Sequence, residues 1–170
     1  SFSRRQRQMC IRDSFNAFQF IQGLETLPLR IKEQCKNAKL VADHLSLSKL
    51  VDKVIYPSLF TGENKKRADT YLDNGFGALI GFEINGGIET GKKFIDSLKL
   101  FYHVANIGDS RSLAIHPAST THSQLSEEDK LRTGVSNSYI RLSIGIEHID
   151  DIINDINNAL IEANRIIKAA

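Results

Sequence analysis

The C-terminal part of the chain carries an apolar stripe that the rest of the fold must cover. Apolar residues recur there at intervals of three and four over about five turns, which predicts one amphipathic helix at residues 149–167. Acids lie towards its start and bases towards its end, as the helix dipole favours. We expect Asp150, Asp151 and Asp155 to be solvated. The stripe comprises Ile149, Ile152, Ile153, Ile156, Leu160, Ala163 and Ile167.

A strand with two contrasting faces precedes this helix, at residues 139–144. Side chains alternate across a strand, so one face is aliphatic and the other is polar. The polar face carries Arg141, whose guanidinium could clamp a carboxylate through two parallel hydrogen bonds. A surface ion pair is the alternative role for this arginine. The two faces consist of Ile140, Leu142 and Ile144, and of Tyr139, Arg141 and Ser143.

The remaining elements mix helices and short strands without strict alternation. A long helix is predicted at residues 25–45, with Pro28 in its first turn. Its buried stripe is expected to be Ile31, Cys35, Ala38, Ala42 and Leu45. Further strands are predicted at 49–56, 77–84, 100–103 and 113–116, and shorter helices at 15–23, 65–72, 89–98 and 126–134. The fold class is therefore α+β, with a small antiparallel or mixed sheet covered on one face by two long helices.

Composition narrows the class of function. The net charge is +2 and the basic residues form no stripe, so nucleic-acid binding is not expected. No apolar run approaches the roughly 18 residues of a membrane span, and the start lacks a secretory signal. The two cysteines, Cys10 and Cys35, have no metal-ligand spacing. We expect a cytoplasmic protein without a metal site.

The first 13 residues differ in composition from the remainder of the chain. Residues 1–13 contain four arginines and show no regular period. We interpret this segment as a non-native cloning junction, or otherwise as a disordered basic arm, and do not expect it to be part of the fold.

Four long strings resemble the pyridoxal-phosphate enzymes of cysteine and methionine metabolism. They are FNAFQFIQGLETLPLRIKEQCKNA from residue 15, INGGIETGKKFIDSLKLF from 84, NIGDSRSLAIHPASTTH from 106 and IRLSIGIEHIDDIINDI from 140. The resemblance implies that residues 14–170 form the C-terminal domain of a fold-type I enzyme. The HPASTTHSQL form from His116 and the asparagine at 106 favour the O-acetylhomoserine sulfhydrylases over cystathionine-handling relatives. A cystathionine γ-synthase, cystathionine γ-lyase or methionine γ-lyase relative is the alternative within the family.

The resemblance also implies an activity for the whole enzyme. Such enzymes, usually cytoplasmic homotetramers, use pyridoxal 5'-phosphate to make homocysteine or methionine from O-acetylhomoserine and sulfide or a thiol. The family's Schiff-base lysine lies in a Ser-x-Thr-Lys context within a larger domain, and the sequence contains no such context. We therefore expect an inactive fragment without catalytic residues or a cofactor site of its own. A non-catalytic amino-acid-binding module is the alternative of another class.

Three residues are candidates for substrate binding. The resemblance implies that Arg141 holds the substrate α-carboxylate and that Asn106 enters the site beside it. Ser112 follows in the same loop and could bind nearby, although a turn role is favoured. His116 and His122 lack the spacing of a metal site and are expected to make structural hydrogen bonds.

Overall fold

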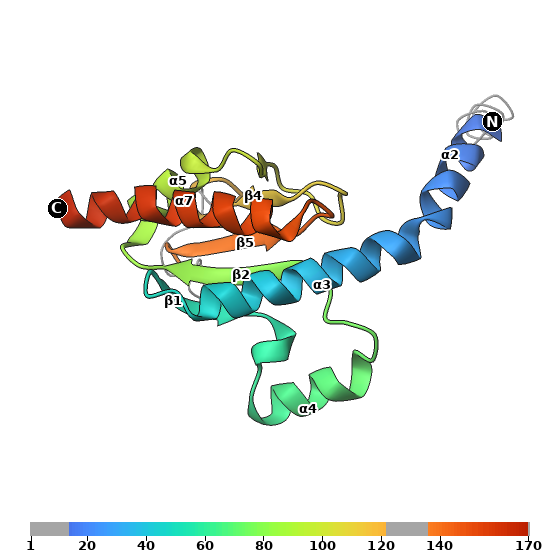
Figure 1. The fold of residues 1–170 in the computed structure, drawn as a ribbon, viewed down its shortest axis with the longest axis horizontal. Coiled ribbons are helices and arrows are strands. Elements are labelled where there is room, and N and C mark those ends of the chain that lie inside the picture. Colours follow the sequence, from blue (N-terminus) through green and yellow to red (C-terminus); the bar gives the residue numbers. More distant parts are fainter. Residues whose placement is uncertain (1–13, 122–135, 170) are drawn as a thin grey trace, which may run out of the picture.

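The computed structural model describes residues 14–121 and 136–169 and shows a five-stranded sheet with helices packed on one face (Figure 1). The spatial order is β1-β2-β5-β4-β3. The pairing is antiparallel except between β3 and β4, which are parallel. The predicted mixed sheet and α+β class are therefore confirmed. The strands are β1 (Val51–Ile55), β2 (Leu79–Ile84), β3 (Tyr102–His103), β4 (Leu113–Ile115) and β5 (Tyr139–Ser143).

Three helices build the core with this sheet. The long helices α3 (Leu27–Ser46) and α7 (Ile149–Ala169) run across it, and α5 (Gly87–Ser97) packs beside α7 (Figure 1). The core joins buried residues of all three helices to one face of the sheet. The ring of Phe94 on α5 meets that of Phe82 on β2 edge to face, with centroids 5.5 Å apart. The predicted helix at 89–98 is confirmed as α5, but its place beside the two long helices on the sheet was not predicted.

The remaining elements lie at the periphery. They are α2 (Ser14–Glu25), α4 (Gly62–Tyr71) and the short 3-10 helices at Pro57–Leu59 and Pro117–Ser119. Helix α2 extends from the start of α3 away from the sheet, and α4 lies on the side of α3 opposite α7 (Figure 1). The predicted segments at 1–13 and 126–134 and the side chain of His122 lie outside the described residues. None of the helices in the described part is long and apolar enough to cross a membrane.

The predicted alternation of β5 is confirmed by burial. Ile140, Leu142 and Ile144 are fully buried against the helices, as are Ile80 and Phe82 of β2. The stripe of α7 is buried at Ile152, Ile156, Leu160 and Ala163, but Ile167 remains 39% exposed. The stripe thus ends one turn earlier than predicted, because the helix runs past the body of the fold near its C-terminus (Figure 1).

The prediction that Asp155 is solvated is wrong. Its side chain is 8% exposed, and its carboxylate accepts hydrogen bonds from the backbone N–H groups of residues 99–101 at 2.9–3.4 Å. These donors follow the end of α5, where the chain turns towards β3. A buried carboxylate is tolerated here because its oxygens are satisfied by oriented backbone donors. Asp155 therefore ties α7 to the segment that enters the sheet.

The predicted stripe of α3 is also partly wrong. Ala38, Ala42 and Leu45 are buried, but Ile31 is 43% exposed and Cys35 is only half-buried. Gln34 and Asn37 take the inner positions instead. Both amides donate to backbone carbonyls: Gln34 to Asp109, and Asn37 to Gly145 and Glu147. These partners remove the cost of burying the amide donors.

We expect Asp155→Asn to destabilise the fold. The amide keeps one acceptor but turns an N–H₂ group towards backbone donors, so the free energy of unfolding should fall by about 1–3 kcal/mol. Denaturant unfolding measures the change, and Asp151→Asn on the exposed side of α7 is the matched control. Equal stability of the two variants would contradict the role assigned to Asp155.

Helix α2 presents an apolar surface that the described residues leave uncovered. Its large apolar side chains, Phe15, Phe18, Phe20, Ile21 and Leu24, are 53–74% exposed. Such a concentration of exposed apolar side chains typically marks an interaction surface. The predicted helix is confirmed, whereas its apolar side chains bury nothing within the described fold.

Because of this surface, we expect the chain on its own to self-associate. Replacing Phe18 and Ile21 by lysine should shift it towards monomer in sedimentation velocity without loss of helical circular dichroism. Replacing Gln19 and Gln22 by lysine adds the same charge while keeping the apolar side chains, and should change the distribution less. A wild-type chain that stays monomeric at high concentration would contradict this expectation.

Candidate functional site

Arg141 lies in the middle of the sheet, on the face opposite the helices. Its strand neighbours are Gly81 on β2 and Ile115 on β4. The guanidinium is half-buried: Nη2 donates to the backbone carbonyl of Asn106 at 3.3 Å, while Nε is buried without a hydrogen-bond partner in the described part of the chain. Among the residues that the structure describes, no carboxylate lies within ion-pair distance of Arg141. This arginine therefore retains donors for an external acceptor.

Tyr139 forms a wall beside this guanidinium. A Cβ placed on Gly81 would lie 2.5 Å from the Tyr139 hydroxyl oxygen and 2.7 Å from its ring, so the ring occupies the space that a side chain at 81 would fill. Burial raises the pKa of the Tyr139 phenol; nearby Arg141 lowers it and Glu83 raises it. The phenol therefore stays protonated at neutral pH and can donate a hydrogen bond beside Arg141. Sequence reasoning missed this residue, although a glycine inside a strand can mark a close approach.

The loop of residues 104–112 brings Asn106 to the site. It connects β3 to β4, and its Asn106 carbonyl accepts the bond from Arg141. The Asn106 side chain is exposed. The N–H of Gly108, at a φ of 77°, donates to Ser143 Oγ at 3.2 Å. The contact with Arg141 is thus made by the backbone of Asn106, and substrate binding by its side chain stays a prediction.

Ser112 is completely buried at the end of this loop. Its N–H and hydroxyl both donate to the carboxylate of Glu147, at 2.6 and 2.8 Å, and its Oγ accepts from the N–H of Gly145 at 2.9 Å. These contacts support the structural role that the sequence favoured for Ser112. A direct bond from its side chain to substrate stays a prediction without a supporting contact here.

A hollow of about 490 Å³ is lined by Ile115, the strand neighbour of Arg141, although Arg141 itself does not line it. Residues 103–105 lead from the hollow to Asn106. The lining residues are His103, Val104, Ala105, Ile115, Thr120 and Thr121. An amino acid held at Arg141 would therefore have an apolar surface with threonine side chains close by.

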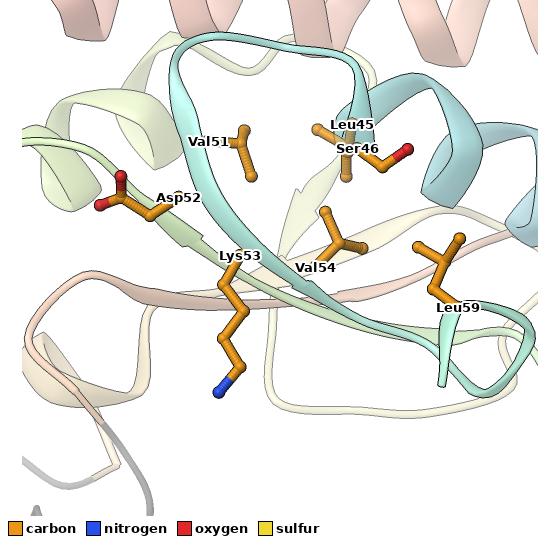
Figure 2. A pocket seen from close by; sticks show the side chains of 7 residues that line it. All are labelled: Leu45, Ser46, Val51, Asp52, Lys53, Val54 and Leu59. Carbon is orange, nitrogen blue, oxygen red and sulfur yellow. The ribbon is translucent and has the colours of Figure 1, made fainter. Parts of the chain in front are cut away.

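Another hollow, of about 230 Å³, lies at the β1 edge of the sheet (Figure 2). It is lined mainly by Leu45, Val51, Val54 and Leu59, while the ammonium end of Lys53 extends away from them (Figure 2). Strand β2 separates this edge from β5. The hollow has no cation directed into it from the described residues, so the face around Arg141 is the better candidate for carboxylate binding.

His116 is a structural residue of the core. Its Nε2 lies 2.9 Å from the carbonyl of Asn137 and its Nδ1 2.8 Å from Ser119 Oγ, an arrangement in which Nε2 carries the proton. Burial lowers the pKa of the imidazole. A Cβ on Gly91 would lie 2.6 Å from Nε2, which explains a glycine inside α5. Within residues 14–121 and 136–169, no three His, Cys, Asp or Glu residues gather at a possible metal site.

The model of a known family matches residues 5–161 of the chain, and its description is Cys/Met metabolism PLP-dependent enzyme. The chain belongs to this family. The match begins inside the segment 1–13, so the non-native origin of that segment stays a prediction. The resemblance given by the four sequence strings is confirmed.

Individual relatives agree with the family match. The chain is 52% identical over 147 residues to O-acetyl-L-homoserine sulfhydrylase of Leptospira meyeri, covering 86% of this chain and 33% of the relative. It is 44% identical to homocysteine synthase of Schizosaccharomyces pombe, covering 86% and 34%. The chain therefore spans about a third of the length of these relatives.

A solved structure extends the likeness to three dimensions. A Campylobacter jejuni protein assigned as O-acetylhomoserine (thiol)-lyase superposes with a TM-score of 0.80 at 43% identity, over 86% of this chain and 35% of that one. That protein carries a pyridoxyl-lysine phosphate at its position 205. The match shows that the α+β fold of this chain corresponds to about a third of that solved structure.

The described residues around Arg141 are chemically suited to an amino-acid carboxylate rather than to pyridoxal phosphate. The guanidinium of Arg141, whose Nε has no partner among the residues that the structure describes, suits a carboxylate. No lysine flanks Arg141 on β5 or on the paired positions of β2 and β4. Substrate binding at Arg141 and the absence of a cofactor-bonding residue from this chain stay predictions.

We expect Gly81→Ala to disturb the wall beside Arg141. The new methyl group overlaps the Tyr139 ring, so the free energy of unfolding should fall by about 1–3 kcal/mol. In a Tyr139→Ala background the same change should cost much less, because the ring is gone. Denaturant unfolding of the four proteins measures this coupling. Gly23→Ala, where nothing lies within 4 Å of an added Cβ, is the control. Equal costs in both backgrounds would contradict the contact.

Proposed function

We propose that this chain is the C-terminal substrate-binding part of an O-acetylhomoserine sulfhydrylase. The complete enzyme would convert O-acetylhomoserine and sulfide into homocysteine and acetate, or take methanethiol and release methionine. The identity of 52% to a relative of that name supports this choice within the family. The one structural observation that carries it is the guanidinium of Arg141 on the open face of the sheet, which has no carboxylate partner among the described residues.

Arg141 suits the α-carboxylate of the substrate for three reasons. Its charge complements a carboxylate, its planar fork can make two parallel bonds, and it stands on a central strand rather than on a loop. The carbonyl of Asn106 holds Nη2 from one side. A carboxylate at the half-buried guanidinium would accept from N–H groups that have no partner among the described residues.

Fixing the carboxylate fixes the rest of the substrate. With that end held, the orientation of the α-carbon and its bonds is set relative to the reacting groups, which lowers the entropic cost of reaction. Pyridoxal phosphate, when bound, supplies the electron sink for this chemistry. The contribution of this chain is to bind and orient the amino acid.

The complete enzyme would be a cytoplasmic homo-oligomer, with a tetramer as the specific form that we propose. The exposed apolar side chains of α2 support a surface that is covered in the assembly. The chain alone would lack activity because it has no lysine in a Ser-x-Thr-Lys context.

The test is Arg141→Lys in the complete enzyme. Lysine keeps the positive charge but loses the fork, and a lost charge-assisted hydrogen bond is worth about 1.5–3 kcal/mol. The KM for O-acetylhomoserine should therefore rise about tenfold or more, while the KM for sulfide changes little. Steady-state kinetics with each substrate varied in turn measures both.

Arg111→Lys is the matched control. Arg111 lies exposed in the same loop, with its guanidinium 4.9 Å from the centre of the Tyr102 ring. Its replacement should leave the KM for O-acetylhomoserine within about twofold of wild type, because this side chain contacts the exposed Tyr102 ring at the outer edge of the loop. An unchanged KM in Arg141→Lys would remove the proposed role of Arg141.

A further inference from the structure

The loop of residues 104–112 sets one side of the Arg141 site, and it is held almost entirely through its backbone. It connects β3 to β4 and supplies the carbonyl of Asn106 to Nη2 of Arg141. Gln34 of α3 donates to the carbonyl of Asp109 at 2.6 Å. The place of Asn106 therefore depends on whatever fixes the two ends of this loop.

Glu147 makes the densest set of contacts at the C-terminal end of the loop. One carboxylate oxygen accepts from the N–H of Ser112 at 2.6 Å and the other from its hydroxyl at 2.8 Å. The same hydroxyl accepts from the N–H of Gly145, which closes a ring of bonds between the loop and the segment after β5. Both donors of a fully buried residue are thus satisfied by one acid.

Gly145 leaves room for this acid. A Cβ at position 145 would collide with the Glu147 carboxylate and would also lie 2.5 Å from the carbonyl oxygen of Ser110. The carbonyl of Ser110 accepts from the N–H of Ile146 at 2.9 Å. The loop and the residues after β5 therefore pack closely around the carboxylate of Glu147.

The same segment also leads directly from Arg141. Ser143, two residues after Arg141, accepts from the N–H of Gly108. Arg141 and Glu147 thus hold the loop from two sides, one through the carbonyl of Asn106 and one through Ser112. Displacement of the Ser112 end would move the carbonyl that orients the guanidinium.

We propose that Glu147 is a positioning residue for amino-acid binding, acting through Ser112 and the 104–112 loop on Arg141. This inference rests on the proposed function. Glu147 does not touch the substrate; it fixes the backbone carbonyl against which Arg141 is aligned. Loss of its carboxylate should leave a folded enzyme whose arginine is less well oriented for a carboxylate.

The test is a double-mutant cycle in the complete, cofactor-loaded enzyme, made of Glu147→Ala, Arg141→Lys and the pair. Glu147→Ala should raise the KM for O-acetylhomoserine about tenfold and leave the KM for sulfide within about twofold. In the double variant the KM should stay within about threefold of Arg141→Lys alone, because Glu147 acts through Arg141. Glu162→Ala, which removes an acid paired with Arg165 on α7, should change neither constant.

Two milder variants keep the test decisive if Glu147→Ala does not fold. Ser112→Ala removes one bond to the carboxylate together with the acceptor of the Gly145 N–H, and Glu147→Gln keeps an acceptor for the N–H of Ser112. Ser112→Ala should raise the KM for O-acetylhomoserine several-fold, whereas Glu147→Gln should rescue most of the loss seen in Glu147→Ala.

The outcomes separate the two proposals. If Arg141→Lys raises the KM while folded variants of Glu147 and Ser112 do not, the positioning role is overturned and the proposed function stands. Effects that multiply in the double variant would likewise show that Glu147 acts independently of Arg141. If Arg141→Lys itself leaves the KM unchanged, the proposed function fails and the positioning role fails with it.

Discussion

The two-residue period of β5 divides its side chains between the core and the open face of the sheet, where we propose that substrate binds. Ile140, Leu142 and Ile144 anchor the strand in the core, and any shift by one residue would carry these side chains to the open face. Because the core fixes the register, Arg141 is fixed on the opposite face without needing a partner of its own. The packing of α3, α5 and α7 thereby helps to fix the position of Arg141, although these helices lie on the other face of the sheet.

Polar side chains, rather than further apolar contacts, join the helices to the loops of this fold. Asp155 fastens α7 to the segment after α5, and Gln34 fastens α3 to the 104–112 loop. In each case a side chain on a rigid helix bonds to the backbone of an irregular segment. Such segments have backbone groups without sheet or helix partners, and a buried side chain can satisfy them. The need to satisfy these backbone groups explains why polar residues occupy positions that apolar residues would otherwise take.

Local patterns predicted the parts of the fold that local physics decides. The alternation in β5 and the stripe of α7 follow from periods of 2 and 3.6, and both were recognisable in the sequence. The burial of Gln34 was not, because its partner carbonyl is 75 residues away along the chain. Asp155 was missed for the same reason, since its first donor lies 56 residues away. Arg141 was proposed from its strand and the family resemblance, and its substrate role stays a prediction. The contacts of Tyr139 and Glu147 are recognisable only when the strands and loops are assembled.

The Nε of Arg141 has no hydrogen-bond partner among the described residues, and this links stability to the proposed function. A buried donor without a partner costs about 1–3 kcal/mol, so a fold selected for stability alone would favour a different residue or a neighbouring acid. Keeping the donor unpaired is reasonable when a ligand completes it, since the same free energy then favours binding. The site also holds Nη2 through the carbonyl of Asn106, which accepts a bond without neutralising the charge. A carboxylate side chain in place of the Asn106 carbonyl would compete with the substrate carboxylate for Arg141. Orientation of a cation by a backbone carbonyl would therefore suit the proposed site, in which an anion has to bind and then leave.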